Sequence, residues 1–331
     1  MTTVKLAPGL SVSRLGYGCA SLMARTGHRE SARLLGLAFE SGITHFDVAR
    51  AYGYGEAEAA VGRFAAGRRD QVTITTKLGI DPPRRSTGLR VAKTVAKGVT
   101  TLSPRLRRSV RERASGLVAT GRFDAAHARA SVDRSLHELR TDYVDLLLLH
   151  DASPDDLSDD LHGFMRACLT SGRALAVGVA STREHAAAVI AADDVYGVAQ
   201  VPDDLLGSLP SSAVPGAQGL VTHSYLAAPL AALIRHLGDA KLRRDWSDQL
   251  DADPLDPQAL AALLLALALD RNPGGVVLAS SRDERHIRGN AAVVNAPLDP
   301  RRLAAFSALL SEASAAGPVR ADAPAAGPTA R

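Results

Sequence analysis

The sequence predicts a single-domain α/β protein folded as a (β/α)8 TIM barrel. Short apolar runs alternate with stretches of helical periodicity along most of the 331 residues, as expected for parallel strands joined by crossover helices. Eight such strands can be counted, which is the number that closes a barrel of this kind. One run, Tyr143–Leu149, is apolar at nearly every position, which is typical of a strand covered on both faces.

A short hairpin is expected before the barrel, with Val4–Leu6 and Leu10–Val12 flanking the turn Pro8-Gly9. The barrel strands are predicted where later apolar runs are bounded by turn residues. In chain order these strands are Arg14–Gly18, Ile43–Asp47, Val72–Thr76, Tyr143–His150, Ala174–Ala180, Gly197–Val201, Gly219–His223 and Gly274–Ser280.

Helices are predicted where apolar residues recur every three or four positions. Ser41-Gly42 and Ser171-Gly172 end two of them, because glycine readily takes the left-handed conformation that closes a helix. The predicted helices are Glu30–Glu40, Ala57–Phe64, Ala125–Leu139, Leu161–Thr170, Glu184–Ala191, Ala228–Leu237, Pro257–Leu269 and Asp283–Val293.

An open doubly wound sheet is the alternative fold that this alternation permits. Such a sheet would carry a glycine-rich fingerprint after its first strand, but Gly16-Tyr17-Gly18 lacks the third glycine. We therefore expect one barrel domain over residues 1–310, with a long basic insertion at 84–122 after the third barrel strand. Residues 311–331, rich in Ala, Pro and Gly, are expected to form a disordered tail.

The composition excludes several classes of protein. An apolar fraction of 46% with a net charge of +4 argues against disorder of the whole chain. Two isolated cysteines exclude a disulfide scaffold and a Cys-rich zinc module, so no metal site is expected. Apolar runs fall short of the ~20 residues of a membrane span, and the N-terminus resembles no export signal. We expect a cytoplasmic protein, and the sequence indicates no oligomeric state.

Positive charge is concentrated in the expected insertion. Residues 84–122 contain eleven Lys and Arg and one acid, Glu112. The arginines between Arg105 and Arg113 are dense enough to bind an anionic substrate or a pyrophosphate, and the segment could act as a lid over the barrel. We expect a solvated loop, because aromatic residues for stacking on nucleic-acid bases are not interleaved with these cations.

Four polar residues are expected to meet on the C-terminal rim of the barrel, where barrel enzymes bind their substrates. Asp47, Lys77 and His150 end or directly follow predicted strands, and Tyr52 lies five residues after Asp47. Each has an ordinary structural explanation on its own, as a solvated lysine, a packed tyrosine or a hydrogen-bonded histidine. Their common location favours a catalytic site.

The sequence around these residues resembles the aldo-keto reductase superfamily. The similarity extends over roughly residues 10–294, and the His150-Asp151 pair is most similar to its aldose and 6-deoxyhexose sugar dehydrogenase branch. The matching blocks are, in chain order, Phe46–Ala49 with Tyr52–Glu56, Thr75–Lys77, Ser135–His150 and Val177–Ser181.

This resemblance implies an NAD(P)H-dependent aldo-keto reductase or alcohol dehydrogenase with the catalytic tetrad Asp47, Tyr52, Lys77 and His150. Tyr52 would exchange a proton with the substrate oxygen as general acid or base. Lys77, held charged by Asp47, would lower the tyrosine pKa from its usual ~10. His150 would orient the carbonyl and share its developing negative charge.

The resemblance also implies a nicotinamide dinucleotide bound across the barrel top, with NADP(H) favoured over NAD(H). Ser181 and Gln200 would hydrogen-bond its carboxamide, and Ser181 replaces an asparagine of the family. His223 takes the place of an aromatic residue that stacks on the nicotinamide, and Tyr225 is the alternative.

The adenosine end of this cofactor is expected near the start of the last predicted helix. Ser280 and His286 stand where the family has a lysine and an arginine, whereas Arg282 keeps a bidentate phosphate donor beside a helix N-terminus. A solvated residue at a helix start is the ordinary explanation of Arg282. The residues implied for this end are Ser281, Arg282, His286 and Asn290.

A few further site residues are expected. Gly18 and Cys19, at the end of the first barrel strand, would contact the cofactor. Met23, Tyr54 and Trp246 are candidates for the substrate pocket, and the loop at 239–256 would cap it. The substrate is expected to be a small carbonyl compound or alcohol, such as a sugar or a secondary metabolite.

Three other functions remain open at this point. The chain could be a non-catalytic NADP(H)-binding regulatory subunit of the same fold, a Schiff-base enzyme with Lys77 as nucleophile, or a nucleic-acid-binding protein acting through its insertion. The complete tetrad and the pairing of Lys77 with Asp47 favour the reductase. No membrane or nucleic-acid partner is expected.

Overall fold

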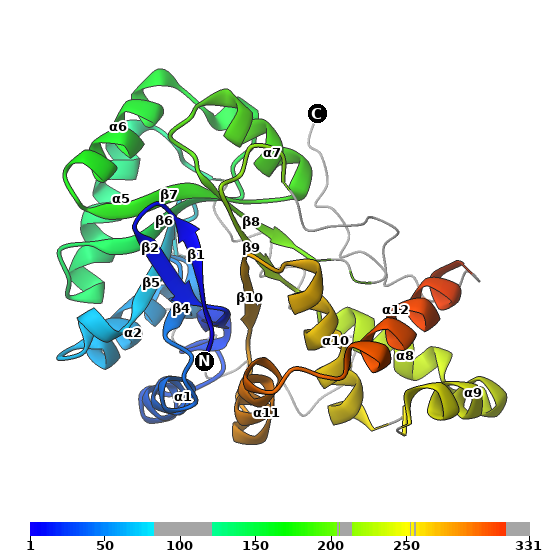
Figure 1. Ribbon diagram of the computed structural model, residues 1–331. Helices are drawn as coiled ribbons and strands as arrows, with labels where there is room; N and C mark the ends of the chain where they lie inside the picture. The colour runs from blue at the N-terminus through cyan, green and yellow to red at the C-terminus, as the bar shows by residue number, and fades with distance from the viewer. Residues whose placement is uncertain (83–120, 204, 206–213, 252, 255, 316–331) are drawn as a thin grey trace, which may run out of the picture.

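The computed structural model describes residues 1–82, 121–203, 205, 214–251, 253–254 and 256–315 of the chain (Figure 1). Within these residues, eight parallel strands close into a barrel in the order β10-β3-β4-β5-β6-β7-β8-β9. The predicted (β/α)8 fold is thus confirmed, and the open doubly wound sheet is excluded because the barrel has no free edge. Residues 84–120 of the expected insertion and 316–331 of the expected tail lie outside the described residues.

The barrel strands begin and end within two residues of their predicted bounds. Their parallel register aligns the carboxyl ends: Gly18 pairs with Asp47, and Lys77 pairs with Leu148. The side chains that end successive strands are therefore brought to one rim. The barrel strands are β3 (Leu15–Gly18), β4 (His45–Asp47), β5 (Thr73–Leu78), β6 (Val144–His150), β7 (Ala174–Ala180), β8 (Val198–Pro202), β9 (Gly219–His223) and β10 (Val276–Ala279).

The N-terminal hairpin closes the opposite end of the barrel. It consists of β1 (Thr3–Ala7) and β2 (Leu10–Ser13), which pair antiparallel as predicted. Its buried Leu6 and Val12 belong to the same apolar cluster as the strand residues that fill the barrel interior. A Cβ atom at Gly219, the first residue of β9, would lie 1.9 Å from the carbonyl oxygen of Leu6, so this close contact requires glycine. The C-terminal end of the barrel is not covered by this hairpin.

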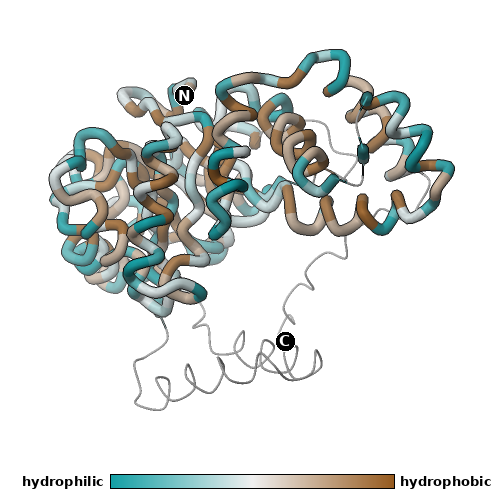
Figure 2. Tube along the Cα trace, turned by 90° about the horizontal axis from the view of Figure 1, so that it is seen from below, coloured by the Kyte–Doolittle hydropathy of each residue, from teal (hydrophilic) through white to brown (hydrophobic). Residues whose placement is uncertain are grey.

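Helices lie around the barrel, and those within residues 227–271 and after residue 300 pack against one another to one side of it (Figure 1). Along them, hydrophobic and hydrophilic residues alternate in bands (Figure 2). Several begin at a capping side chain: Asp124, Ser158 and Thr182 each accept a hydrogen bond from a backbone N–H in the first turn. The helices are α1 (His28–Glu40), α2 (Ala57–Ala65), α5 (Ala125–Leu139), α6 (Asp159–Thr170), α7 (Arg183–Ala192), α8 (Ala227–His236), α9 (Ala240–Leu250), α10 (Pro257–Arg271), α11 (Glu284–Asn295) and α12 (Pro300–Ala315), with short 3-10 turns η1 (Cys19–Ser21), η2 (Tyr52–Gly55), η3 (Arg69–Gln71) and η4 (Pro154–Asp156).

Two helices correct the sequence prediction. The segment 239–256 is not simply a loop, because α9 occupies most of it; Leu242, Trp246 and Leu250 form an apolar stripe at intervals of four residues among many charges. Helix α12 extends to Ala315, so the expected tail cannot start at 311. Apolar residues at helical spacing bury one face of α12, and Ala313 is part of the core.

Candidate active site

A cavity of about 570 Å³ opens at the C-terminal end of the barrel. Every barrel strand contributes to its wall, so the aligned strand ends form a single site. The strand residues that line it are Gly18 (β3), Asp47 (β4), Lys77 (β5), His150 (β6), Ala180 (β7), Gln200 and Pro202 (β8), His223 (β9), and Leu278 and Ala279 (β10).

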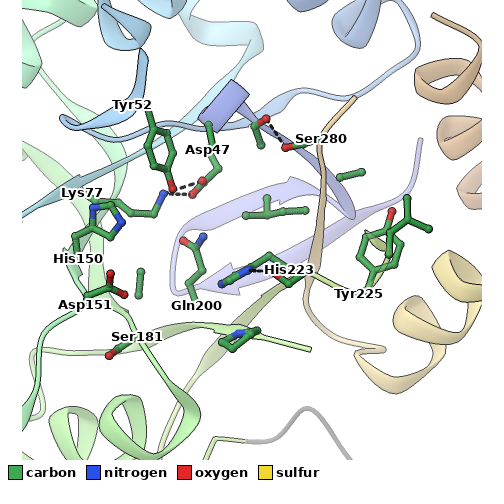
Figure 3. A pocket seen from close by; sticks show the side chains of 18 of the residues that line it. Asp47, Tyr52, Lys77, His150, Asp151, Ser181, Gln200, His223, Tyr225 and Ser280 are labelled. Carbon is green, nitrogen blue, oxygen red and sulfur yellow. Dashed lines mark hydrogen bonds and ion pairs between the residues drawn. The ribbon is translucent and has the colours of Figure 1, made fainter. Parts of the chain in front are cut away.

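Lys77 and Asp47 form a buried ion pair at the base of this cavity (Figure 3). The Lys77 ammonium donates to both carboxylate oxygens of Asp47 at 2.7 Å and to the carbonyl of Val48 at 3.1 Å. Only 1% of Lys77 and 3% of Asp47 is exposed. Burial works to lower the pKa of Lys77, but the charges of Asp47 and Tyr52 outweigh it, and the pKa is raised. Lys77 is therefore favoured in its charged form, which is unsuited to act as a Schiff-base nucleophile.

Tyr52 lies directly beside this cation. The Lys77 ammonium nitrogen is 4.9 Å from the centre of the Tyr52 ring, and the phenol lines the cavity. Burial raises the pKa of Tyr52, and the charge and hydrogen bond of Lys77 counteract this only in part. Lys77 acts in the expected direction, but desolvation exceeds its effect, so the pKa of Tyr52 lies above its usual value. Tyr52 is a neutral phenol at physiological pH, which makes it a proton donor.

His150 completes the group of four predicted residues. Its ring packs edge-on against the ring of Tyr52, with the centres 5.8 Å apart. Burial, followed by the charges of Lys77 and His223, lowers the pKa of His150 to about 3, so the imidazole is neutral. Its Nδ1 is buried and has no hydrogen-bond partner among the described residues. Such an atom costs free energy unless a ligand satisfies it.

A buried carboxylate behind the tetrad links two of its elements. Glu58 of α2 is 1% exposed; it accepts a hydrogen bond from Thr76 at 2.6 Å and forms a 3.0 Å ion pair with Arg50. Thr76 precedes Lys77, and Arg50 lies in the loop between Asp47 and Tyr52. This role of Glu58 was not predicted from the sequence. The only available signal was an acid on the apolar face of α2.

The cofactor residues expected near the tetrad do line the cavity. Gly18, Ser181, Gln200 and His223 all contribute to its wall. The Gln200 side-chain oxygen is buried without a partner in the described residues, so it can accept a hydrogen bond from an amide ligand. Figure 3 shows His223 beside Gln200 and Tyr225 farther from Tyr52, which favours His223 over Tyr225 as the group near a bound nicotinamide ring. These residues fit the expected dinucleotide.

The imidazole ring of His223 is fixed in orientation. Its Nδ1 is hydrogen-bonded to the Ser224 hydroxyl at 2.8 Å. Burial lowers the pKa of His223, which keeps the ring neutral. A neutral imidazole presents a flat face to a ligand, with a smaller area than a tyrosine ring.

Other expected cofactor residues lie outside the cavity wall. Cys19 is fully buried in the apolar core and does not line the cavity. The four residues expected for the adenosine end lie at and just before the first turns of α11. There the Ser281 hydroxyl accepts a hydrogen bond from the Asp283 N–H at 3.1 Å.

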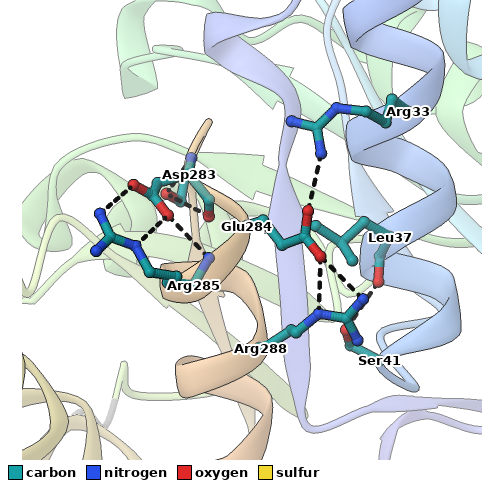
Figure 4. Close-up of polar contacts among 8 residues, drawn as sticks. Arg33, Leu37, Ser41, Asp283, Glu284, Arg285 and Arg288 are labelled. Carbon is teal, nitrogen blue, oxygen red and sulfur yellow. Dashed lines mark hydrogen bonds and ion pairs between the residues drawn. The ribbon is translucent and has the colours of Figure 1, made fainter.

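The arginines around the start of α11 differ in their pairing. Arg285 pairs with Asp283 at 3.2 Å, and Glu284 pairs with Arg33 at 3.2 Å and with Arg288 at 3.0 Å (Figure 4). Exposed Arg282 has no hydrogen bond or ion pair within the described residues. The start of α11 therefore presents one guanidinium whose charge is not neutralised by a neighbouring acid.

The three residues expected in the substrate pocket do not line the cavity. Met23 is 7% exposed and packs near the Ser31 hydroxyl, which donates to its sulfur at 3.4 Å. Tyr54 is 41% exposed. Trp246 is buried because α9 packs it against Phe306 of α12, with ring centres 6.2 Å apart. The cavity instead contains polar residues that were not expected: Asp151, Thr182, Ser224 and Ser280.

The described residues contain neither a cluster suited to a metal ion nor a helix suited to cross a membrane. No cluster of three or more His, Cys, Asp or Glu side chains there has the arrangement of a metal site. No helix in the same residues combines the length and apolar character that a membrane crossing requires.

Comparisons with known proteins show the family to which the chain belongs. Residues 14–201 match the model of the "Aldo/keto reductase family". The chain is 30% identical over 188 residues to a 6-dehydroglucose reductase of Agrobacterium fabrum, covering 55% of this chain and 54% of that protein. It is 31% identical over 159 residues to a D-threo-aldose 1-dehydrogenase of a Pseudomonas species, covering 46% and 44%. The matched region thus spans about half the length of these relatives.

Solved structures show the same fold over nearly the whole chain. An aldo-keto reductase of Bacillus halodurans in its holo form superposes with a TM-score of 0.67 at 21% identity, covering 93% of this chain and 96% of that one. An aldo/keto reductase of Klebsiella pneumoniae in complex with NADP and acetate gives a TM-score of 0.64 at 21% identity, covering 93% and 95%.

Proposed function

Because the chain belongs to the aldo/keto reductase family, we propose that it is an NAD(P)H-dependent oxidoreductase that interconverts a carbonyl compound and an alcohol. The observation that carries this proposal is the grouping of a neutral phenol, a buried ammonium and a neutral imidazole at one cavity. The relatives named for 6-dehydroglucose and D-threo-aldose make a sugar-type carbonyl a candidate substrate.

Tyr52 supplies the proton in the reduction direction. Addition of hydride to a carbonyl carbon leaves negative charge on the oxygen, and the neutral phenol protonates it. Lys77 then stabilises the phenolate that remains, since its charge favours the ionised form. Asp47 keeps Lys77 charged and in position through two 2.7 Å hydrogen bonds. In the oxidation direction, the phenolate accepts the alcohol proton.

His150 orients the carbonyl. A neutral imidazole carries one N–H, and the buried Nδ1 is unpartnered in the described residues. We propose that the imidazole donates a hydrogen bond to the substrate oxygen, which strengthens as negative charge develops there. One donor of this kind contributes about 3 kcal/mol to transition-state stabilisation in other enzymes.

The nicotinamide dinucleotide supplies the hydride when it is bound. Gln200 and Ser181 would hold its carboxamide, and His223 would pack against the ring. We propose NADP(H) as the preferred form, because Arg282 is an unneutralised guanidinium beside the N-terminus of α11, the kind of position that binds phosphate. Arg285 and Arg288 are already paired with acids.

The direct test is steady-state oxidation of NADPH with a panel of aldehydes, ketones and sugars. The proposal predicts turnover with at least one carbonyl class. NADPH binding, followed by cofactor fluorescence, without turnover of any substrate would instead support the regulatory subunit. Failure to bind either NADPH or NADH would overturn the proposal altogether.

A further inference from the structure

Asp151 is a cavity residue that the mechanism above does not use. It directly follows His150 at the end of β6, and its side chain lines the cavity next to the catalytic imidazole (Figure 3). Its backbone N–H donates to the carbonyl of Ala180 at 2.7 Å, which fixes the residue in place. Its φ is +56°, a left-handed conformation that Asp and Asn tolerate better than most residues.

Asp151 is an exposed residue of the cavity wall, and its carboxylate makes no hydrogen bond or ion pair within the described residues. Partial burial raises the pKa of Asp151, and the charge of Lys77 counteracts this only in part. The turn itself does not require a charge, since asparagine would adopt the same backbone conformation. The carboxylate is thus an acceptor-only group whose lone pairs are available to a ligand.

The other charged or titratable groups around the cavity do not supply that partner. Lys77 is held by Asp47 at 2.7 Å, Tyr52 is a neutral phenol, and His150 and His223 are neutral imidazoles. Asp151 therefore gives this part of the wall a net negative charge. A substrate that fills the cavity removes water from the carboxylate, and this costs free energy unless the substrate brings a donor.

We propose that Asp151 is a substrate-specificity residue whose carboxylate accepts hydrogen bonds from hydroxyl groups of the carbonyl substrate. The inference rests on the proposed reductase function and deepens it: the cavity selects hydroxylated aldehydes or ketones over deoxy compounds of the same length. A substrate ammonium is the other donor that a carboxylate could bind, and the experiment below distinguishes it from a hydroxyl group. A hydrogen bond to a charged acceptor corresponds to about 10- to 100-fold in selectivity.

The test compares kcat/KM for NADPH-dependent reduction of glyceraldehyde and propanal, which differ by two hydroxyl groups. The native chain is expected to prefer glyceraldehyde by about 10-fold or more. Asp151→Asn retains the left-handed backbone but removes the charge. It should lower kcat/KM for glyceraldehyde by about 10-fold and leave kcat/KM for propanal unchanged, so the preference falls by the same factor. Asp142→Asn is the matched control, since Asp142 is an exposed acid just before the other end of β6, and it should leave the ratio unchanged.

The outcomes separate the two proposals. A chain that binds NADPH but reduces neither aldehyde overturns the reductase function. Equal kcat/KM for the two aldehydes, or a preference that survives in Asp151→Asn, overturns the role of Asp151 while leaving the reductase function intact. A native preference for 3-aminopropanal over both probes would assign the carboxylate to a cation and also overturn hydroxyl selection. Unchanged NADPH affinity in Asp151→Asn shows that the variant is folded.

Discussion

Replacing Lys77 with methionine should affect folding and catalysis separately. The Lys77 ammonium is 1% exposed and lies 2.7 Å from both oxygens of a carboxylate that is itself almost fully buried. Removing the cation leaves Asp47 as an uncompensated buried charge, which destabilises the folded chain by about 3 to 5 kcal/mol. The same change removes the charge that favours the Tyr52 phenolate, so the phenol holds its proton more tightly and kcat should fall at least about 100-fold.

A double variant separates these effects. Asp47→Asn with Lys77→Met removes both charges, so most of the lost stability should return because no unpaired ion is buried. Catalysis should not return, since Tyr52 still has no neighbouring cation. Urea unfolding and single-turnover reduction of a carbonyl substrate measure the two quantities. Native-like turnover in the double variant would refute the role assigned to the ion pair.

Tyr52→Phe should lower kcat by about 100- to 10,000-fold with NADPH affinity retained, as measured by steady-state kinetics and cofactor fluorescence; residual turnover near the native rate would exclude Tyr52 as the proton donor. Arg282→Ala should reduce the ratio of NADPH to NADH affinity by about 10-fold, whereas Arg285→Ala, whose guanidinium is paired with Asp283, should leave the ratio unchanged. An equal effect of both substitutions would place the 2′-phosphate elsewhere. Stability should also fall in acid, because burial lowers the pKa of His45 from 6.5 to about 4 in the folded chain. The unfolded chain binds the extra proton as the pH falls from 6.5 to 4, so this residue should cost about 3 kcal/mol of unfolding free energy over that range, and His45→Gln should flatten the profile measured by urea unfolding.

Two sequence features predicted most of the fold and site: the short apolar runs that form strands, and the polar residues at the ends of those runs. The barrel strands were predicted within two residues because each is a short apolar run between turns. Asp47, Lys77 and His150 could be placed together because parallel strands bring their carboxyl ends to one rim.

The sequence did not determine which way individual side chains point. Cys19 follows Gly18 directly, but it is buried in the apolar core while Gly18 lines the cavity. Trp246 was expected at the pocket because the charges around it obscured the four-residue spacing of α9, which buries it against Phe306. Local sequence patterns of this kind do not determine whether a side chain lies at the cavity or in the core.

The net pKa of Tyr52 could not be predicted from the sequence either. The neighbouring lysine was correctly expected to lower it, but the depth of burial, which raises it more, depends on packing of the whole rim. Glu58 was missed for a related reason: its partners Thr76 and Arg50 come from separate loops and strands that only the folded barrel brings together.

The role of Tyr52 as a neutral proton donor can be measured through the pH dependence of the reaction. Replacing Tyr52 with a fluorinated tyrosine, whose phenol is more acidic but nearly the same size, should move the basic limb of the carbonyl-reduction profile to lower pH by the difference between the two phenol pKa values. A limb that stays at the same pH, with turnover retained, would show that a different group supplies the proton.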